Sequence, residues 1–424
     1  MAIDSIPTAA MPPLKAFKIV LPKTRLDRLK LIKTLFPEHT GSDLGEDWLG
    51  GRTEALRRLA KIKPLSYAKN RNFLDGDVTR LSPYLRHGCI TIAEAIHTTK
   101  KMVNTGGAEK LLFEFAWRDY WRKVWYTQGQ AIDSDMEPAK VQLTRQGLAN
   151  DILEGESGLA CMDHFVSKLM QTGYLHNHAR MWLASYLVHW RGVDWKAGAL
   201  WMQSLLLDGD QASNNLSWQW VASTFGSKSY FFNKENLSKY SNNQFCRECK
   251  AQCPFDKSYD TLSTQLFKPS SASAKQYKKI PTRQFEQTLG NKTIVLFHDE
   301  MLSIEHPLYQ NAHQKIFVFD PKIHEGWAIN RLQFMADCLI EMSDVEVWQG
   351  SLAAVLASLD VAIVITQDTP NLLFKFNLNG YVVDYRPELE PYAESVAKKL
   401  QVHDLKRFSK YWHKVGPEIL KPLD

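Results

Sequence analysis

The chain has 424 residues, of which 44% are hydrophobic and 23% are charged. This composition is ordinary for a globular protein and excludes a disordered or fibrous chain, while the length predicts two or three domains. No apolar stretch approaches the ~20 residues of a membrane span, and the N-terminus lacks the basic and apolar regions of a secretory signal. We therefore expect a cytoplasmic protein, and its formal charge of +6 is compatible with a polyanionic partner.

The first half of the chain is predicted to be helical. From residue 26 to residue 220 the apolar positions recur with helical spacing, and ten of the thirteen tryptophans lie at or before Trp220. Individual helices are predicted over residues 110–127, 174–191 and 194–207. Asp194 can cap the third helix because its side chain can accept a bond from the first-turn amides. That helix should end at the turn-forming tripeptide Asp208-Gly209-Asp210.

The last third of the chain shows a different pattern. A polar stretch at residues 268–284 is predicted to be a linker. Beyond it, short runs rich in β-branched residues predict strands at 292–297, 315–320, 345–350, 361–366 and 381–385, with a helix at 327–342. Strands that alternate with helices favour a parallel, doubly wound α/β sheet. We expect a helical domain over residues 1–260, a linker over 261–290 and an α/β domain over 291–424.

Charged residues share a face with tryptophans on the first predicted helix. Glu114, Trp117, Arg118 and Trp121 follow one another at helical spacing, so they project from the same side. One interpretation is a buried Glu114–Arg118 pair inside an aromatic core. The other is the wall of a cleft for a flat, polar ligand.

Further polar residues accumulate along the next two helices. Asn177, Arg180 and Met181 share a face of the helix predicted over residues 174–191. After the helix predicted over residues 194–207, four polar residues follow within eight positions: Asp208, Asp210, Asn214 and Asn215. Burying such groups is costly unless something bonds to them. A turn or a helix cap can satisfy one or two, and a large heteroaromatic ligand can satisfy more. Upstream, residues 77–83 suit either a phosphate-binding turn or a plain helix start with proline in the first turn.

Four runs of residues together resemble the flavin domain of the cryptochrome/photolyase family. They are TRLSPYLRHGCI (79–90), EFAWRDYW (114–121), TGYLHNHARM (172–181) and DGDQASNNLSWQW (208–220), and the resemblance covers residues 26–240. It implies an all-α domain that holds FAD and a light-driven repair enzyme that splits cyclobutane pyrimidine dimers. The alternative is a cryptochrome-type photoreceptor without repair activity. A third interpretation is an oligonucleotide-binding protein that lacks flavin.

The resemblance also implies roles for individual residues. The FAD phosphates would be held by Tyr67, Thr79, Leu81 and Ser82, and the isoalloxazine would contact Arg118, Asp208, Asp210 and Asn214. Arg80, Arg180 and Gly209 complete the implied cofactor site. Binding of the lesion would fall to Glu114, Trp117, Asn177 and Met181, with Asn214 beside flavin N5. Two positions depart from the pattern: Val78 replaces a hydroxyl residue, and His178 stands where many repair enzymes have arginine.

The family's electron-transfer tryptophans are matched in part. Trp218 and Trp195 correspond to the inner two members of that chain. The outer member has no counterpart near Gln142, so Trp182, Trp190 and Trp201 are the remaining candidates.

The six cysteines suggest a metal site. Cys246, Cys249 and Cys253 lie at chelating spacing but are one ligand short of the four that zinc or a cubane cluster needs. Similarity to the iron–sulfur bacterial branch of the same family implies Cys161 as the fourth ligand. We therefore expect a [4Fe–4S] cluster, with zinc as the alternative.

The predicted α/β domain resembles the antenna domain with which family members begin. The similar segments are residues 293–321 and 331–350, so the domain order is circularly permuted here. The resemblance leaves the antenna pigment open among a deazaflavin, a folate, a lumazine and none. UV-damaged DNA, single- or double-stranded, is the implied partner, and a monomer is favoured.

Overall fold

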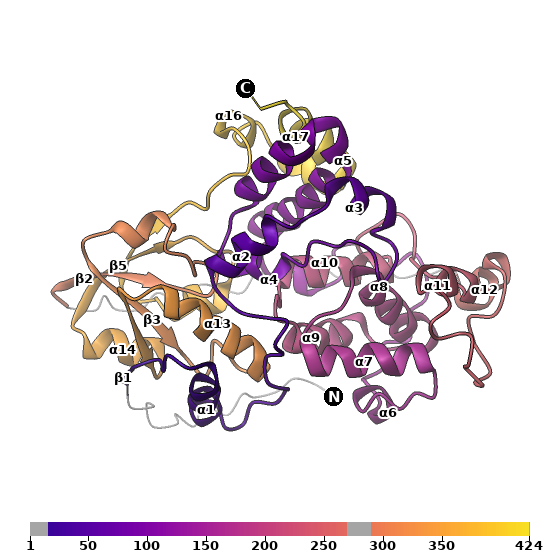
Figure 1. Cartoon of the computed structure of the whole chain (residues 1–424), viewed down its shortest axis with the longest axis horizontal. Coiled ribbons are helices and arrows are strands. Elements are labelled where there is room, and N and C mark those ends of the chain that lie inside the picture. Colours follow the sequence, from indigo (N-terminus) through magenta and orange to yellow (C-terminus); the bar gives the residue numbers. More distant parts are fainter. Residues whose placement is uncertain (1–15, 269–289, 424) are drawn as a thin grey trace.

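The computed structural model describes residues 16–268 and 290–423, so most of the predicted linker lies outside the described residues. Most helices of the first half gather on one side of the molecule, and a six-stranded sheet lies on the other, where α1 also packs beside α13 (Figure 1). Among the described residues, no helix combines the length and the hydropathy needed to cross a bilayer.

The first half is helical, as predicted. Its elements are α1 (Arg25–Leu35), α2 (Arg52–Leu59), α3 (Pro64–Asn70), α4 (Ser82–Arg86), α5 (Ile92–Gln128), η1 (Gly129–Asp133), α6 (Asn150–Leu153), α7 (Ala160–Thr172), α8 (Asn177–Ser185), η2 (Tyr186–Trp190), α9 (Trp195–Leu205), α10 (Gln211–Ala222), α11 (Lys234–Tyr240) and α12 (Tyr259–Leu266). Asp194 caps α9, where its carboxylate accepts a bond from the Lys196 amide. A π-helical turn, η2, continues α8, so the helix predicted over residues 174–191 has two parts.

All five predicted strands are present in the sheet. They are β2 (Lys292–Phe297), β3 (Gln314–Phe319), β4 (Val345–Gln349), β5 (Val361–Gln367) and β6 (Val382–Arg386). These five pair in parallel in the order β4-β3-β2-β5-β6. An additional strand, β1 (Phe17–Ile19), comes from the start of the described chain and pairs antiparallel with β4. The sheet is therefore mixed, and its chain order reverses between β2 and β5, where doubly wound sheets bind ligands.

The remaining elements surround the sheet and return to the helical half. They are η3 (Pro307–Gln310), α13 (Ile329–Glu341), α14 (Leu352–Ser358), α15 (Leu372–Phe376), α16 (Glu394–Ala397), η4 (Val402–Lys406) and α17 (Phe408–Ile419). Figure 1 shows α17 beside α5, far from the sheet. Phe408, Tyr411 and Val415 of α17 are buried in the same core as the inner face of α5.

One apolar core joins the two halves. Leu81 and Tyr84 of the helical half lie in the same buried cluster as Phe334 of α13 and Val347 of β4. Because the apolar surfaces of both halves are buried against each other, the hydrophobic effect stabilises their relative placement.

Candidate functional site

The centre of the candidate site is the loop between α9 and α10, the predicted turn Asp208-Gly209-Asp210. Gly209 has a φ of +37°, in the left-handed region that favours glycine. Asp210 caps α10, because its carboxylate accepts a bond of 2.8 Å from the Ser213 amide. Only 3% of Asp208 and 8% of Asp210 is exposed. The turn thus places two carboxylates in the interior.

Each buried carboxylate is paired with an arginine from another helix. Arg180 of α8 donates to both oxygens of Asp208, at 3.2 and 2.9 Å. Arg118 of α5 lies 2.7 Å from Asp210. The Ser82 hydroxyl also bonds to Asp208. The structure therefore brings together six of the predicted cofactor-binding residues, counting Gly209 of the loop, whereas the alternative Glu114–Arg118 pair does not form.

These pairs keep both carboxylates ionised. Burial raises the pKa of Asp210, but the charges of Arg118, Arg86 and Arg122 outweigh it, and the pKa lies well below the usual range. Burial likewise raises the pKa of Asp208, and the ion pair with Arg180 reverses the shift. The loop therefore presents two fixed negative charges at neutral pH.

Asn214 lies one turn into α10. Its amide donates to the Ala199 carbonyl at 2.9 Å and to the Asn215 side chain at 3.1 Å. Asn215 in turn donates to Asp133 at 2.8 Å. A cavity of about 360 Å³ opens beside this network, bordered by Trp195 and Ala199 of α9. The predicted residue Asn214 is thus held in a defined orientation by the backbone of α9.

The predicted phosphate-binding turn borders a second cavity. Val78, Thr79 and Arg80 line a space of about 500 Å³, together with the basic side chains Arg57, Arg58, Lys61 and Lys63 and the acidic side chains Glu46, Asp47, Glu54 and Asp77. Arg80 has a φ of +54°, and Leu81 behind it is buried. Tyr67 of α3 is half-buried, and burial raises the pKa of its hydroxyl.

The predicted lesion-binding residues lie on α5 and α8. Glu114 forms ion pairs with Lys110 at 3.1 Å and with Arg71 at 3.6 Å. Burial and the nearby charge of Arg71 lower the pKa of His178 on α8, so Arg71 lies close to both helices.

Trp117 has a partner that the sequence did not indicate. The ring of Trp117 is stacked on Phe408 of α17, with 3.7 Å between centroids and an interplanar angle of 8°. Asn177 is exposed at the start of α8, and its amide lies 3.4 Å from the sulfur of Met181. One face of Trp117 is therefore covered by the last helix of the chain.

The inner two predicted electron-transfer residues pack on one helix. Trp195 and Trp218 are 1% and 2% exposed. The Trp218 ring lies against Gly198, one turn after Trp195, where an added Cβ would come within 2.5 Å of the ring. Trp195 donates to Asp135 at 2.7 Å. Of the three candidates for an outer relay, Trp182 is fully buried, whereas Trp190 and Trp201 are half-buried.

Three of the four predicted cluster cysteines lie in one apolar cluster. Cys161, in the first turn of α7, and the half-buried Cys246 and Cys253 belong to the same apolar cluster. Burial raises the pKa of Cys161 to about 12, and the neighbouring Cys246 and Cys253 add to the shift. Burial also raises the pKa of Cys246, where Cys253 and Cys249 contribute. Among the described residues, no group of three or more His, Cys, Asp or Glu side chains is arranged to hold a metal ion.

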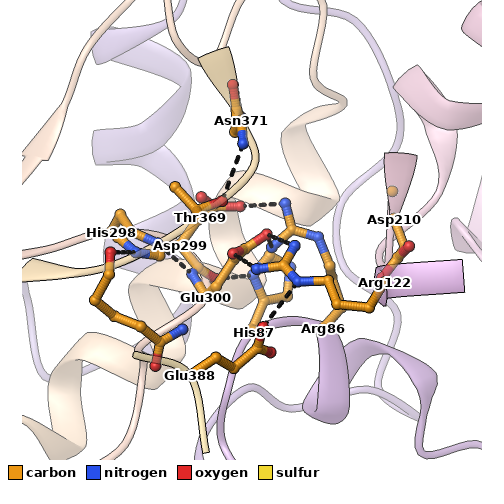
Figure 2. Close-up of polar contacts among 12 residues, drawn as sticks. Arg86, His87, Arg122, Asp210, His298, Asp299, Glu300, Thr369, Asn371 and Glu388 are labelled. Carbon is orange, nitrogen blue, oxygen red and sulfur yellow. Dashed lines mark hydrogen bonds and ion pairs between the residues drawn. The ribbon is translucent and has the colours of Figure 1, made fainter. Parts of the chain in front are cut away.

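A buried ion network between the two halves escaped the sequence analysis. Arg86 of α4 lies 2.7 Å from Asp299 and 3.2 Å from Glu300, both in the loop after β2. Arg122 of α5 donates to both oxygens of Glu300, at 3.0 and 2.5 Å, and pairs with Glu388 at 2.9 Å (Figure 2). Arg86 lies in the run at residues 79–90 and Asp299 follows the predicted strand at 292–297, but nothing in either segment predicts that the two side chains meet.

Comparison with known proteins defines the class of the helical half. Residues 111–260 match the model of the FAD binding domain of DNA photolyase. A deoxyribodipyrimidine photo-lyase of Streptomyces griseus is 35% identical over 192 residues, which are 44% of this chain and 39% of that protein. Cryptochrome DASH, chloroplastic/mitochondrial, of Oryza sativa subsp. japonica is 30% identical over 197 residues, covering 43% of this chain and 34% of that protein. A Synechocystis sp. cryptochrome structure is 25% identical, with a TM-score of 0.43 over 47% of this chain and 44% of that chain.

The chain therefore combines a helical FAD-binding domain of the photolyase type with a mixed, mostly parallel sheet domain, which confirms the predicted fold class. These matches support the photolyase/cryptochrome family and FAD binding. The chain spans about a third to two fifths of the length of these two relatives.

The residues of the site fit such a cofactor. The hydroxyl of Thr79 and the guanidinium of Arg80 at the larger cavity suit a diphosphate, whereas Arg57, Arg58 and Lys63 there pair with Glu54 and Asp77. The ionised Asp208 and Asp210 can accept bonds from ring N–H groups.

Proposed function

We propose that this protein binds FAD and uses light to split cyclobutane pyrimidine dimers in UV-damaged DNA. The observation that carries the proposal is the pair of buried, arginine-bound carboxylates Asp208 and Asp210, inside the segment that matches the photolyase FAD-binding domain. The similarity to a named photo-lyase of Streptomyces griseus supports the activity. FAD, when bound and reduced, supplies the light-excited electron donor for this reaction.

The chain's own residues would bind and orient the cofactor. Asp208 and Asp210 offer acceptors to the polar edge of the ring, and Arg118 and Arg180 hold the two carboxylates in place. The side chain of Asn214 is held in one orientation, because its amide donates to the Ala199 carbonyl. We propose that the phosphates are held by Tyr67 of α3 and by four residues in the turn before α4 and at its start: Thr79, Arg80, Leu81 and Ser82.

The DNA lesion would be bound by residues of α5 and α8. A flipped pyrimidine pair needs an aromatic plane for stacking and polar groups for its base edges. We assign the plane to Trp117 and the polar contacts to Glu114 and Asn177, with Met181 as an apolar neighbour. The positive net charge of the chain is compatible with binding to the phosphate backbone.

Repair can be measured directly. FAD-loaded, reduced protein is mixed with oligothymidine that contains dimers, and recovery of the thymine absorbance is followed during illumination. We expect recovery with the unaltered protein and weaker lesion binding, by about 1–3 kcal/mol, in Trp117→Ala, because base stacking is lost. Trp412→Ala is the matched control, since Trp412 packs in the same aromatic group but has no proposed role. Loss of flavin in Trp117→Ala would contradict the assignment of this residue to the lesion.

One observation favours a second function, a blue-light photoreceptor of the cryptochrome type. Phe408 already stacks on one face of Trp117, so that face is not open to a base. A protein that binds and photoreduces FAD but restores no thymine absorbance would be explained by this alternative. The two proposals share the cofactor and differ only in this assay.

For the cysteines we propose a [4Fe–4S] cluster on Cys161, Cys246, Cys249 and Cys253, with zinc as the alternative metal. The support is the apolar cluster that Cys161 shares with Cys246 and Cys253, and the chelating spacing of the last three cysteines. Iron, acid-labile sulfide and zinc are to be quantified in anaerobically purified protein. Cys161→Ser should lower the bound metal, whereas Cys89→Ser, at a buried thiol outside the group, should not. Metal-free, folded protein would contradict both forms of the proposal.

We further propose that Trp218 and Trp195 carry electrons toward the flavin. Trp195 begins α9, and Trp218 packs against Gly198 of the same helix, next to the Ala199 carbonyl that Asn214 contacts. The α/β half is proposed to be a displaced antenna-type domain, in line with its doubly wound strand order.

A further inference from the structure

A single arginine of the α/β half reaches the loop at the centre of the candidate site. Arg331 is the third residue of α13 and is 1% exposed. Its guanidinium lies directly against Gly209, because a Cβ added to this glycine would come within 1.9 Å of Nη1. The α/β half therefore touches the loop between its two buried aspartates.

The guanidinium of Arg331 has few partners for a buried cation. None of its three nitrogens has a hydrogen-bond partner among the residues that the structure describes. Its only ion pair there is with Asp299, at 3.8 Å, and its ring partner is Trp327, 3.4 Å from the central carbon. Burying a charge with so little compensation is costly. The N–H groups of Arg331 are thus available as hydrogen-bond donors, in the interior beside the proposed flavin site.

The charges around Arg331 explain why it stays ionised. Burial and the repulsion from Arg86 lower the pKa of Arg331 to about 9, while the carboxylates of Asp299, Asp208 and Asp210 act in the opposite direction. The group is therefore a cation at neutral pH. Because Arg331 is buried against Gly209, its charge acts on the loop through a medium of low dielectric, in which charges interact strongly.

The contact also explains the glycine. A residue with a side chain at position 209 would need a φ of +37° and would collide with the guanidinium. Gly209 is consequently required both for the turn and for the approach of Arg331. Removing the guanidinium would leave a void beside the loop and an interior with one cation fewer for three carboxylates.

We propose that Arg331 is a positioning residue of the flavin site, which fixes the Asp208-Gly209-Asp210 loop and supplies positive charge that favours the electron-rich, reduced form of bound FAD. The inference rests on the proposed FAD binding and deepens it. It gives the α/β half a direct part in setting the reduction potential, in addition to any pigment that this domain holds.

The test uses the full-length protein loaded with FAD. The midpoint potential is measured by reductive titration against a reference dye, and the dissociation constant of FAD by fluorescence, for the unaltered chain, Arg331→Met and Arg331→Lys. We expect a more negative potential and an FAD dissociation constant about tenfold higher in Arg331→Met, since a buried charge and a contact to the loop are lost. Arg331→Lys, which keeps the charge, should restore much of the potential but not all of the affinity.

Arg28→Met is the matched control. Arg28 is also a buried arginine at the contact between the two halves, and its Nε donates to Asp337 of α13 at 2.8 Å. Asp337 lies six residues after Arg331, or about 9 Å along the helix. This variant should weaken the contact between the halves without changing the flavin potential.

The outcomes separate the inference from the function on which it rests. An unchanged potential and affinity in FAD-loaded Arg331→Met would overturn the inference alone, and so would an equal shift in Arg28→Met. Unaltered protein that takes up no FAD would overturn the proposed function and the inference together. If Arg331→Met does not fold, the Lys variant tests the guanidinium by the affinity: an FAD dissociation constant equal to that of the unaltered protein would overturn the proposal that Arg331 fixes the loop.

Discussion

At the level of single residues, the aspartates of this protein show how their partners decide whether burial is tolerated. Asp208 and Asp210 are buried against arginines and stay ionised. Asp119 of α5 is buried to a similar extent, at 5% exposed, but its bonds come from the neutral hydroxyls of Tyr392 and Tyr411. Burial therefore raises the pKa of Asp119 to about 6, from an ordinary 3.8. Its ionisation opposes folding.

Asp119 should make stability fall as the pH rises. Between about pH 4 and pH 6 the unfolded chain releases this proton while the folded protein retains it, so the free energy of unfolding decreases; above pH 6 both states are ionised and the effect is constant. Asp119→Asn should remove a loss of about 3 kcal/mol across this window. Urea unfolding at several pH values measures it, and Asp47→Asn, at an exposed carboxylate, is the control. An unchanged slope in Asp119→Asn would contradict the assignment.

At the level of elements, α17 is the element on which the candidate lesion site depends most. Phe408 stacks on Trp117, and Tyr411 bonds to the buried Asp119, so this helix packs directly on α5. Tyr120 of α5 donates to the Leu405 carbonyl, just before α17 begins, at 2.9 Å. The end of the chain is therefore part of the helical half.

Truncating Phe408 should destabilise the protein strongly. Phe408 is 6% exposed, and Phe408→Ala leaves a cavity beside Trp117, for which a loss of about 3–5 kcal/mol is typical. Thermal or chemical unfolding measures the change. Phe17→Ala removes the same atoms from a side chain that is 48% exposed on β1, and it should cost far less. Equal losses in the two variants would show that the stack on Trp117 does not contribute.

The elements also show how far the sequence leads. The strands β2 to β6 were predictable because β-branched runs of five to seven residues carry their own signal. The three-residue strand β1 was not, since its pairing depends on β4, more than 300 residues away. Helical spacing placed Glu114 beside Arg118, yet Arg118 pairs with Asp210 because that carboxylate is buried and Glu114 has Lys110 and Arg71.

Contacts between the two halves could not be predicted from the sequence for a related reason. The motifs around Arg86 and Asp210 were visible, but the approach of Arg331 to Gly209 joins residues that no local periodicity connects. Such contacts follow from the packing of α13 on the helical half, which only the folded chain defines.

At the level of the whole molecule, the ion network between the halves should be essential to stability. Glu300 accepts bonds from Arg122 and lies 3.2 Å from Arg86, and all three side chains are buried or nearly so. Breaking a buried pair leaves an uncompensated charge. The joint between the halves is thus electrostatic as well as apolar.

Glu300→Gln should lower the free energy of unfolding by about 1–3 kcal/mol, because Arg86 and Arg122 lose a shared buried carboxylate but keep Asp299 and Glu388 as partners. Denaturant unfolding at low and high salt measures it, and the loss should change little with salt since the network is shielded from ions. Glu346→Gln is the control, at a surface pair with Lys18 of 3.1 Å, where we expect less than about 1 kcal/mol. A Glu300→Gln variant as stable as this control would contradict the role of the network.

The strand β1 has a consequence for the connectivity of the molecule. The sheet takes its edge strand from the beginning of the described chain, and α1 follows it with the Arg28–Asp337 bond to α13, so the first segment of the helical half is tied to the sheet side at two places. Cutting the backbone once between residues 268 and 290 would consequently yield two fragments that stay assembled, each completing the other's folded unit. Hydrolysis at an engineered protease site there should leave a single species in size-exclusion chromatography, which separates only in denaturant.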